Sequence, residues 1–181
     1  MTISETNLKD CFIVEPKIFE DKRGYFFESY NAELFNSHAG ANINFVQDNE
    51  SFSIQGVLRG LHFQKGDHAQ AKLVRVIQGK ILDVVVDIRE KSETYGQHTS
   101  VILSAANKRQ LFVPRGFAHG FVVLSKEAIF SYKCDNYYNK PAESGIRFND
   151  PKLNIDWVLP MDELIVSDKD LELPYLNDLH S

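Results

Sequence analysis

Short runs of alternating hydrophobic and polar residues follow one another through most of the chain, separated by Gly, Pro, Asn and Asp. Alternation with a period of two is typical of strands, because successive side chains of a strand point to opposite faces of the sheet. The expected strands cover residues 73–77, 80–88, 99–103, 110–113, 120–124 and 128–133. Between the first two, Gln78-Gly79 predicts a hairpin turn, because Gly adopts a positive φ without steric cost.

Helical patterns are few. Only residues 32–37 and the acidic C-terminal stretch have a helical character, so strands do not alternate with helices as they do in a parallel sheet. We therefore expect a mainly all-β fold, either a closed barrel or a double-sheet sandwich of the jelly-roll type, with a few short helices chiefly near the C-terminus. No linker, repeat or low-complexity tract divides the chain, which predicts a single domain over residues 1–181.

Composition narrows the function classes. The chain is 43% hydrophobic with a net charge of -5, which is typical of a soluble globular protein and argues against nucleic acid as a partner. No apolar run approaches the roughly 20 residues of a membrane span, and the N-terminus lacks the basic start and apolar core of a secretion signal. Cys11 and Cys134 show neither zinc nor redox spacing. We expect a cytoplasmic protein with no membrane contact.

Three cationic or titratable side chains occur in apolar, strand-like segments: Arg59, His62 and Lys72. Together they could hold an anion, remove a proton and stabilise the negative charge that results. Any one alone more often faces solvent, but the three together favour a site. Arg59 and His62 are three residues apart, so a regular strand would send them to opposite faces; a bulge at Gly60 would bring them together.

Later strands add polar residues to apolar faces. His119 shares a face with Phe121, and Tyr132 shares one with Phe130. Such a face is typical of a pocket wall and equally of a core whose polar residue sits at the rim. Asp83 and Asp87 also share a face, which a glycoside hydrolase could use. Because no sugar-platform aromatic residues accompany them, we expect loop-anchoring or strand-end roles instead.

Residues 113–119 fit the pattern Pro-x-Gly-x-x-His and resemble the second half of the motif of the cupins, jelly-roll barrels that often bind a metal. The first half of that motif supplies His-x-His and then Glu, but here residues 61–64 read Leu-His-Phe-Gln. His62 and His119 are only two candidate ligands, with Gln64 a poor third, whereas a stable site usually needs three. The pattern predicts a cupin-type jelly-roll barrel that holds no metal.

Over most of its length the chain is similar to the dTDP-4-dehydrorhamnose 3,5-epimerase family. The resemblance rests on ten short strings in the same order, at residues 19–28, 47–51, 56–64, 69–76, 83–89, 114–121, 132–134, 149–151, 155–157 and 167–170. It departs from the family at Lys65-Gly-Asp-His68, where members often carry a proline-rich turn. That loop does not include the expected proton-transfer groups.

The resemblance implies a set of catalytic residues. His62 would be the general base, Asp170 the carboxylate that orients it, Tyr132 the opposing proton donor, and Lys72 the cation beside the C4 carbonyl of the sugar. Asp168 lies two residues from Asp170 and stays open as the alternative partner. No cofactor is implied.

The resemblance also implies a nucleotide site and a homodimer. Arg23, Arg59 and His119 would grip the diphosphate. Tyr138 would stack on thymine. The other nucleotide and sugar contacts would be Glu28, Gln47, Asn49, Glu143 and Lys169. The N-terminal segment would help to build the partner subunit's site.

The implied activity is the cofactor-free inversion of C3 and C5 of dTDP-4-keto-6-deoxy-D-glucose, which gives dTDP-4-dehydro-L-rhamnose for dTDP-rhamnose biosynthesis. Three alternatives remain open. They are an epimerase that acts at C3 or C5 only, a metal-dependent cupin enzyme, and a sugar-nucleotide binding protein without turnover.

Overall fold

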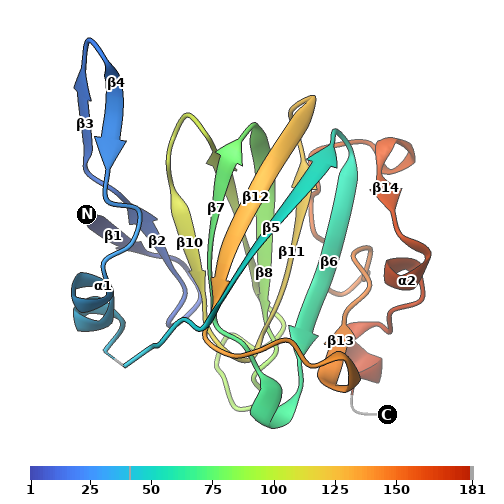
Figure 1. Ribbon diagram of the computed structural model, residues 1–181. Coiled ribbons are helices and arrows are strands. Elements are labelled where there is room, and N and C mark those ends of the chain that lie inside the picture. The colour runs from blue at the N-terminus through green and yellow to red at the C-terminus, as the bar shows by residue number, and fades with distance from the viewer. Residues whose placement is uncertain (41, 180–181) are drawn as a thin grey trace.

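Two antiparallel sheets face each other in the computed structural model, which describes residues 1–40 and 42–179 (Figure 1). The first sheet contains, in order, β1 (Thr2–Glu5), β2 (Phe12–Glu15), β10 (Gln110–Val113), β7 (Lys72–Gln78), β12 (Glu127–Cys134) and β5 (Gln47–Ile54). The second contains β13 (Glu143–Gly145), β6 (Val57–Gln64), β11 (Phe117–Val123), β8 (Lys80–Asp87) and β9 (His98–Ser104), with β14 (Ile165–Val166) pairing in parallel with β6. The expected mainly-β fold is confirmed.

The helices are short. They are α1 (Ala32–Ala39), α2 (Asp168–Leu171) and the 3-10 turns η1 (Gly66–His68), η2 (Lys140–Ala142), η3 (Met161–Glu163) and η4 (Leu176–Asp178). The side chain of Asn31 caps α1 by accepting a hydrogen bond from the backbone N–H of Leu34. Phe35 anchors this helix through its fully buried ring, which packs against Phe12 and Phe112 of the first sheet. Among the described residues, no helix combines the length and apolar character that crossing a membrane requires.

Strand β8 shows why the two sheets hold together. Its alternate residues Ile81 and Val85 belong to the cluster between the sheets. The intervening residues, Leu82, Val84 and Val86, lie on the outer face under the C-terminal segment that contains Trp157. Both faces of this strand are thus buried, which explains its nearly continuous hydrophobic sequence. The C-terminal segment covers the outside of the second sheet (Figure 1).

The prediction of a hairpin at Gln78-Gly79 was wrong. β7 and β8 lie in different sheets, so the chain passes at Gly79 from one sheet to the other. Gly79 has φ +82°, and a Cβ there would lie 2.1 Å from the carbonyl oxygen of Glu127. A tight hairpin and this crossing both require such a residue, so the local sequence does not distinguish them.

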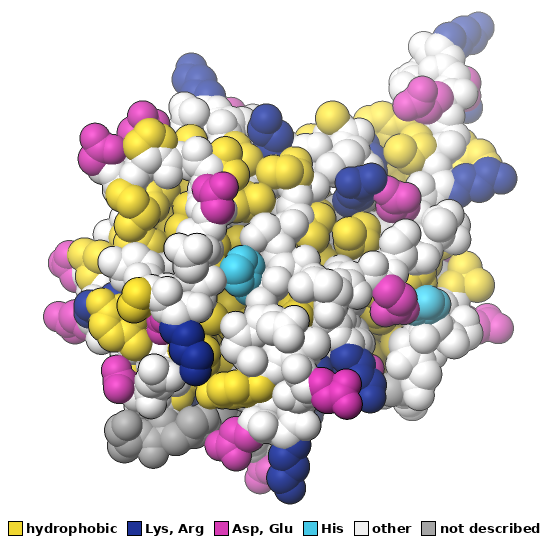
Figure 2. All heavy atoms as spheres, turned by 180° about the vertical axis from the view of Figure 1, so that it is seen from behind, with side chains coloured by type: hydrophobic (Ala, Val, Ile, Leu, Met, Phe, Trp, Pro, Cys, Tyr) yellow, Lys and Arg dark blue, Asp and Glu magenta, His cyan; other side chains and the backbone are white. Residues whose placement is uncertain are grey.

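A two-stranded arm, β3 (Ile18–Asp21) and β4 (Gly24–Phe27), projects from the body of the molecule (Figures 1 and 2). Basic side chains lie at its tip in Figure 2. Its aromatic residues Phe19, Tyr25 and Phe26 are 53%, 57% and 70% exposed. An arm with this much exposed aromatic surface is typical of a segment that packs on a partner.

The loop after β8 is anchored by Asp87, as expected for this residue. Its carboxylate accepts hydrogen bonds from Arg89, from Ser92 Oγ at 2.6 Å and from Thr94 Oγ1 at 2.7 Å. Burial alone would raise the pKa of Asp87, but these hydrogen bonds outweigh it and bring the pKa to about 2.

We expect Asp87→Asn to lower the free energy of unfolding by about 2 kcal/mol at pH 7, because the ionised carboxylate accepts these hydrogen bonds better than an amide does. A depressed pKa contributes stability above the unfolded-state value and loses it as the pH falls through the folded-state value. The difference between wild type and variant in urea unfolding should therefore shrink to about half at pH 3. Asp10→Asn is the control: Asp10 also pairs with Arg89 but is exposed, so its replacement should hardly change the free energy of unfolding. A pH-independent difference would contradict this account.

Candidate functional site

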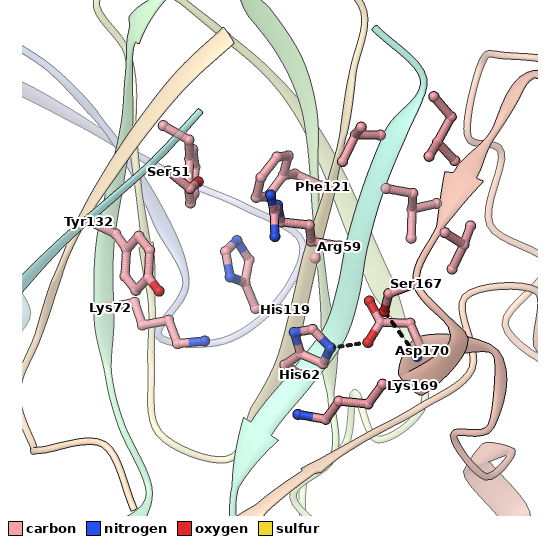
Figure 3. Close-up of a pocket in the computed structure, with 16 residues that line it drawn as sticks. Ser51, Arg59, His62, Lys72, His119, Phe121, Tyr132, Ser167, Lys169 and Asp170 are labelled. Atoms are coloured by element: carbon pink, nitrogen blue, oxygen red, sulfur yellow. Dashed lines mark hydrogen bonds and ion pairs between the residues drawn. The ribbon is translucent and has the colours of Figure 1, made fainter. Parts of the chain in front are cut away.

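A cavity of about 540 Å³ is lined by residues of both sheets, and its volume is within the usual range of small-molecule sites. Strands β6, β7, β11 and β12 and helix α2 contribute to its lining (Figure 3). Of the residues expected in the site, it is lined by Arg59, His62, Lys72, His119, Tyr132, Lys169 and Asp170.

Two glycines allow β6 to direct both Arg59 and His62 into this cavity. The pairing of β6 with β11 shifts register between His119 and Phe121, opposite Gly60, so the predicted irregularity is confirmed. Gly60 has φ +129°, and a Cβ there would lie 2.5 Å from the Cα of Gly120. The close approach of two glycine backbones thus places side chains three residues apart in one cavity.

His62 is paired with a buried carboxylate. Its Nε2 lies 2.6 Å from Oδ1 of Asp170, whose side chain is 5% exposed, and the backbone N–H of Gly60 donates to the other carboxylate oxygen. Burial by itself would raise the pKa of Asp170, but the hydrogen bond and charge of His62 outweigh it and hold the pKa below its usual range. With Nε2 engaged, Nδ1 of His62 lies on the cavity side of the ring (Figure 3).

The choice between Asp168 and Asp170 depends on α2. Ser167 caps this one-turn helix and accepts a hydrogen bond from the backbone N–H of Asp170. The cap turns Asp170 inward, where it is 3% exposed, and leaves Asp168 exposed in the first turn. Asp170 is therefore the partner of His62.

Tyr132 and Lys72 stand on the opposite wall, because β12 and β7 belong to the first sheet whereas β6 belongs to the second (Figure 3). Lys72 Nζ lies 6.0 Å from the centroid of the Tyr132 ring. Burial raises the pKa of Tyr132, so its phenol keeps its proton. Burial also lowers the pKa of Lys72. The His62 imidazole and the Tyr132 phenol thus face each other across the cavity, with the amine of Lys72 beside the phenol.

His119 lies on β11, which pairs with β6 in the second sheet, and it forms a second His–Asp pair beside the first (Figure 3). Its Nε2 lies 3.0 Å from each carboxylate oxygen of Asp83, which is completely buried. The loop or strand-end role expected for Asp83 was wrong. Asp83 lies within the Val-rich β8, on the face turned to the inter-sheet core. A carboxylate in such a position requires a polar partner, and its place in this hydrophobic run predicts one from sequence. Burial raises the pKa of Asp83, while His119 opposes that shift.

A smaller hollow of about 160 Å³ adjoins the cavity, sharing His62, Lys72 and Tyr132 with it. It is also lined by Gln47, Asn49, Tyr138 and Glu143, four more of the expected residues. Tyr138 Oη donates to Glu143 at 2.9 Å, and Lys169 Nζ lies 2.6 Å from the same carboxylate. Burial would raise the pKa of Glu143, but the hydrogen bonds from Lys169 and Tyr138, together with the nearby positive charge of Lys169, outweigh it and lower that pKa.

The family model for dTDP-4-dehydrorhamnose 3,5-epimerase matches residues 5–178. The chain belongs to this family. It is therefore an epimerase, that is, an isomerase.

Members of the epimerase family are similar to this chain over nearly its full length. The crystal structure of dTDP-4-dehydrorhamnose 3,5-epimerase from Elizabethkingia anophelis is 56% identical, covers 100% of this chain and 99% of its own, and superposes with a TM-score of 0.97. The corresponding epimerase from Legionella pneumophila, solved in complex with dTDP-4-keto-L-rhamnose, is 48% identical, with coverage of 98% and 94% and a TM-score of 0.94. The Escherichia coli K12 enzyme is 49% identical, with coverage of 99% and 96%.

Two residues expected in the epimerase site lie apart from the cavity. Arg23 is at the tip of the β3–β4 arm, with its side chain 83% exposed and paired with Asp21. Glu28 directly follows the arm and is exposed. Within one chain the fold does not bring these two residues to the other site residues.

The donor set of this epimerase does not suit a metal. Nε2 of each cavity histidine is bonded to an aspartate, so each ring offers only Nδ1 as a possible metal donor. The amide of Gln64 is fully occupied by loop backbone. Within residues 1–40 and 42–179, no three His, Cys, Asp or Glu side chains converge in a way that could hold a metal ion. The described part of the chain therefore offers His62 and His119 no third ligand.

Proposed function

We propose that the chain inverts both C3 and C5 of dTDP-4-keto-6-deoxy-D-glucose and releases dTDP-4-dehydro-L-rhamnose, using only its own side chains. The observation that supports this most strongly is the placement of the His62–Asp170 pair and Tyr132 on opposite walls of one cavity. Inversion needs a base on one face of the reacting carbon and an acid on the other. The family membership is in accord with the proposal.

The protons at C3 and C5 are acidic because each carbon neighbours the C4 ketone. In the proposed step, Nδ1 of His62 takes one proton and the C–H electron pair moves into an enolate whose charge lies on the C4 oxygen. Asp170 favours the imidazolium that forms. Tyr132 then donates its phenolic proton to the opposite face. Proton exchange with water then returns the imidazolium to imidazole and the phenolate to phenol. Every step transfers a proton, and the oxidation state of the sugar does not change.

Lys72 stabilises the enolate in this proposal. Its ammonium beside the developing oxyanion lowers the energy of the charged intermediate more than that of the neutral ketone, and only such a difference accelerates the reaction. Because burial lowers the pKa of Lys72, the useful charge is lost at a lower pH than for an exposed lysine.

We expect Lys72→Ala to reduce kcat by about 100-fold, equivalent to about 3 kcal/mol, with little change in dTDP affinity. Lys72→Arg keeps a cation and should retain more activity than Lys72→Ala. Since activity needs the protonated form and falls as the pH rises through the pKa, the arginine variant should also shift the alkaline limb of the kcat profile upward. Steady-state kinetics from pH 6 to 10 check both points. An unchanged kcat in Lys72→Ala would remove Lys72 from this role.

In this proposal the substrate occupies both the cavity and the smaller hollow beside it. Arg59, held by its Nε–H donating to Ser53 Oγ at 3.2 Å, and His119 would bind the diphosphate. Tyr138, about half exposed, would stack on thymine. The remaining nucleotide and sugar contacts would be Gln47, Asn49, Glu143 and Lys169.

The active form would be a homodimer in which each β3–β4 arm supplies Arg23 and Glu28 to the partner subunit's cavity. The arm's projection and its exposed aromatic residues support this arrangement. Each chain would be one cupin-type domain working in the cytoplasm.

Mixing two impaired variants tests the exchange of arms. We expect Arg23→Ala and His62→Ala each to be inactive alone. After mixed refolding, about half of the dimers are heterodimers with one intact site, so about one quarter of wild-type activity should return. No recovery, with dimers confirmed by light scattering, would contradict arm exchange.

The overall function is tested by proton NMR of dTDP-4-keto-6-deoxyglucose incubated with chelator-treated protein in heavy water. The double epimerase predicts loss of both the H3 and the H5 signals with formation of product. Loss of one signal would identify a single-site epimerase. Activity that returns only with added metal would identify a metal-dependent enzyme, and dTDP binding without exchange would identify a binding protein.

A further inference from the structure

Gln64 ends β6 two residues after His62, and its side chain is almost entirely enclosed: the residue is 8% exposed. Its Oε1 accepts a hydrogen bond from the backbone N–H of Asn139 at 2.6 Å. Its Nε2 donates to the carbonyl oxygens of His68 at 2.8 Å and Tyr137 at 3.2 Å. All three bonds go to the backbone of two loops, 65–69 and 135–139, and both amide protons are used.

The second of these loops carries Tyr138 and is held from its other side by Gln47. The backbone N–H of Tyr138 donates to Gln47 Oε1 at 3.0 Å, and Gln47 Nε2 donates to Asn49 Oδ1 at 2.9 Å. Residues 137, 138 and 139 are therefore each bonded through the backbone to a glutamine side chain. Tyr138 itself is 54% exposed, so its placement depends on this backbone and on the Glu143 contact more than on packing.

The first loop, residues 65–69, contains no proline. Proline would restrict its backbone, whereas here side chains tie it to the Tyr138 loop. Gln70 Nε2 donates to the carbonyl of Asn136 at 2.7 Å, and Asn136 Nδ2 donates to the carbonyl of Asp67 at 2.9 Å. Gln64 lies at the junction of both loops with β6.

We propose that Gln64 is a positioning residue that holds the Tyr138 ring in place as a preformed platform for the base of a nucleoside diphosphate, and links that platform to the strand that carries His62. This inference rests on the proposed function, which assigns nucleotide stacking to Tyr138. A platform ordered before binding avoids the entropy cost of ordering an exposed ring when the base arrives.

Gln64→Glu tests the proposal with almost no change in shape. The carboxylate keeps an acceptor for Asn139 but turns oxygen toward the two carbonyls that Gln64 now serves as a donor. We expect dTDP to bind about tenfold more weakly and KM to rise by a similar factor, with kcat at saturation almost unchanged. Inorganic pyrophosphate, which reaches only the Arg59 and His119 region, should bind as in wild type. Gln55→Glu is the matched control, since Gln55 donates to a backbone carbonyl at an exposed turn outside both loops.

A double-mutant cycle separates positioning from a general structural effect. If Gln64 acts through Tyr138, adding Gln64→Glu to Tyr138→Ala should weaken dTDP binding no further. Additive losses, or equal losses for dTDP and pyrophosphate, would overturn the proposal. If wild type fails to bind dTDP, the proposed function itself fails. If dTDP binds but Tyr138→Ala has no effect, only the platform role fails.

Discussion

Replacing His62 with alanine is expected to abolish measurable exchange of the C3 and C5 protons with solvent. General-base catalysis typically contributes 10²- to 10⁴-fold, and in the proposed mechanism His62 is the base for both carbons, so the loss in kcat should be about 10³-fold or more. The affinity for dTDP should stay nearly intact, because Arg59 and Tyr138 do not depend on the imidazole. Deuterium incorporation followed by NMR measures the exchange, and calorimetry measures the affinity.

Loss of activity in His62→Ala must be separated from loss of structure, because the variant leaves the buried Asp170 without its main partner. A buried polar group without a hydrogen-bond partner lowers the free energy of unfolding by about 1–3 kcal/mol. His62→Gln is the control, since an amide N–H can still donate to Asp170 but an amide cannot act as a base at neutral pH. Both variants should be inactive, with His62→Gln closer to wild type in urea unfolding. Exchange at the wild-type rate in either variant would exclude His62 as the base.

Replacing Tyr132 with phenylalanine is expected to separate exchange from inversion. The base and the Lys72 ammonium still form the enolate, so deuterium should enter the substrate. Without the phenol, the proton donor proposed for the opposite wall is missing, and we expect the enolate to be reprotonated mainly from the His62 side. We expect product formation to fall by about 100-fold or more while deuterated substrate of unchanged configuration accumulates.

Proton coupling constants of the recovered sugar distinguish these outcomes, because they report the configuration at C3 and C5. Tyr95→Phe is the matched control: Tyr95 packs against the outer hydrophobic cluster, away from the cavity, and its loss of a hydroxyl should not affect inversion. Inverted product formed at the wild-type rate by Tyr132→Phe would show that another group, such as water, supplies the proton.

The strands of the inter-sheet core were predictable from local sequence. Period-two alternation in β11 places His119 and Phe121 on one face whatever the partner strand, because it follows from backbone geometry alone. The irregularity at Gly60 was predictable for the same local reason. Sheet membership was not predictable: Gly79 has the positive φ that a hairpin needs, yet the chain there passes between sheets. Strand partners are chosen by long-range packing, which leaves no local signal.

The site residues divide in the same way. The sequence shows which side chains can act as acid, base or cation. The resemblance to a known family predicted that His62, Lys72 and Tyr132 share one site. Only the tertiary structure showed that Asp170, and not Asp168, bonds to His62. The capped turn of α2 buries the carboxylate of Asp170 and exposes that of Asp168.

The partner of Asp83 was likewise decided in three dimensions. A buried aspartate predicts some partner, but the identity of that partner, His119, depends on how two strands that are distant in sequence lie side by side. The sequence by itself therefore determined the strands, the faces their side chains take and the chemistry those side chains offer. Which groups meet across the cavity was decided by the packing of two sheets, because hydrogen bonds form between atoms brought close in space by the whole chain.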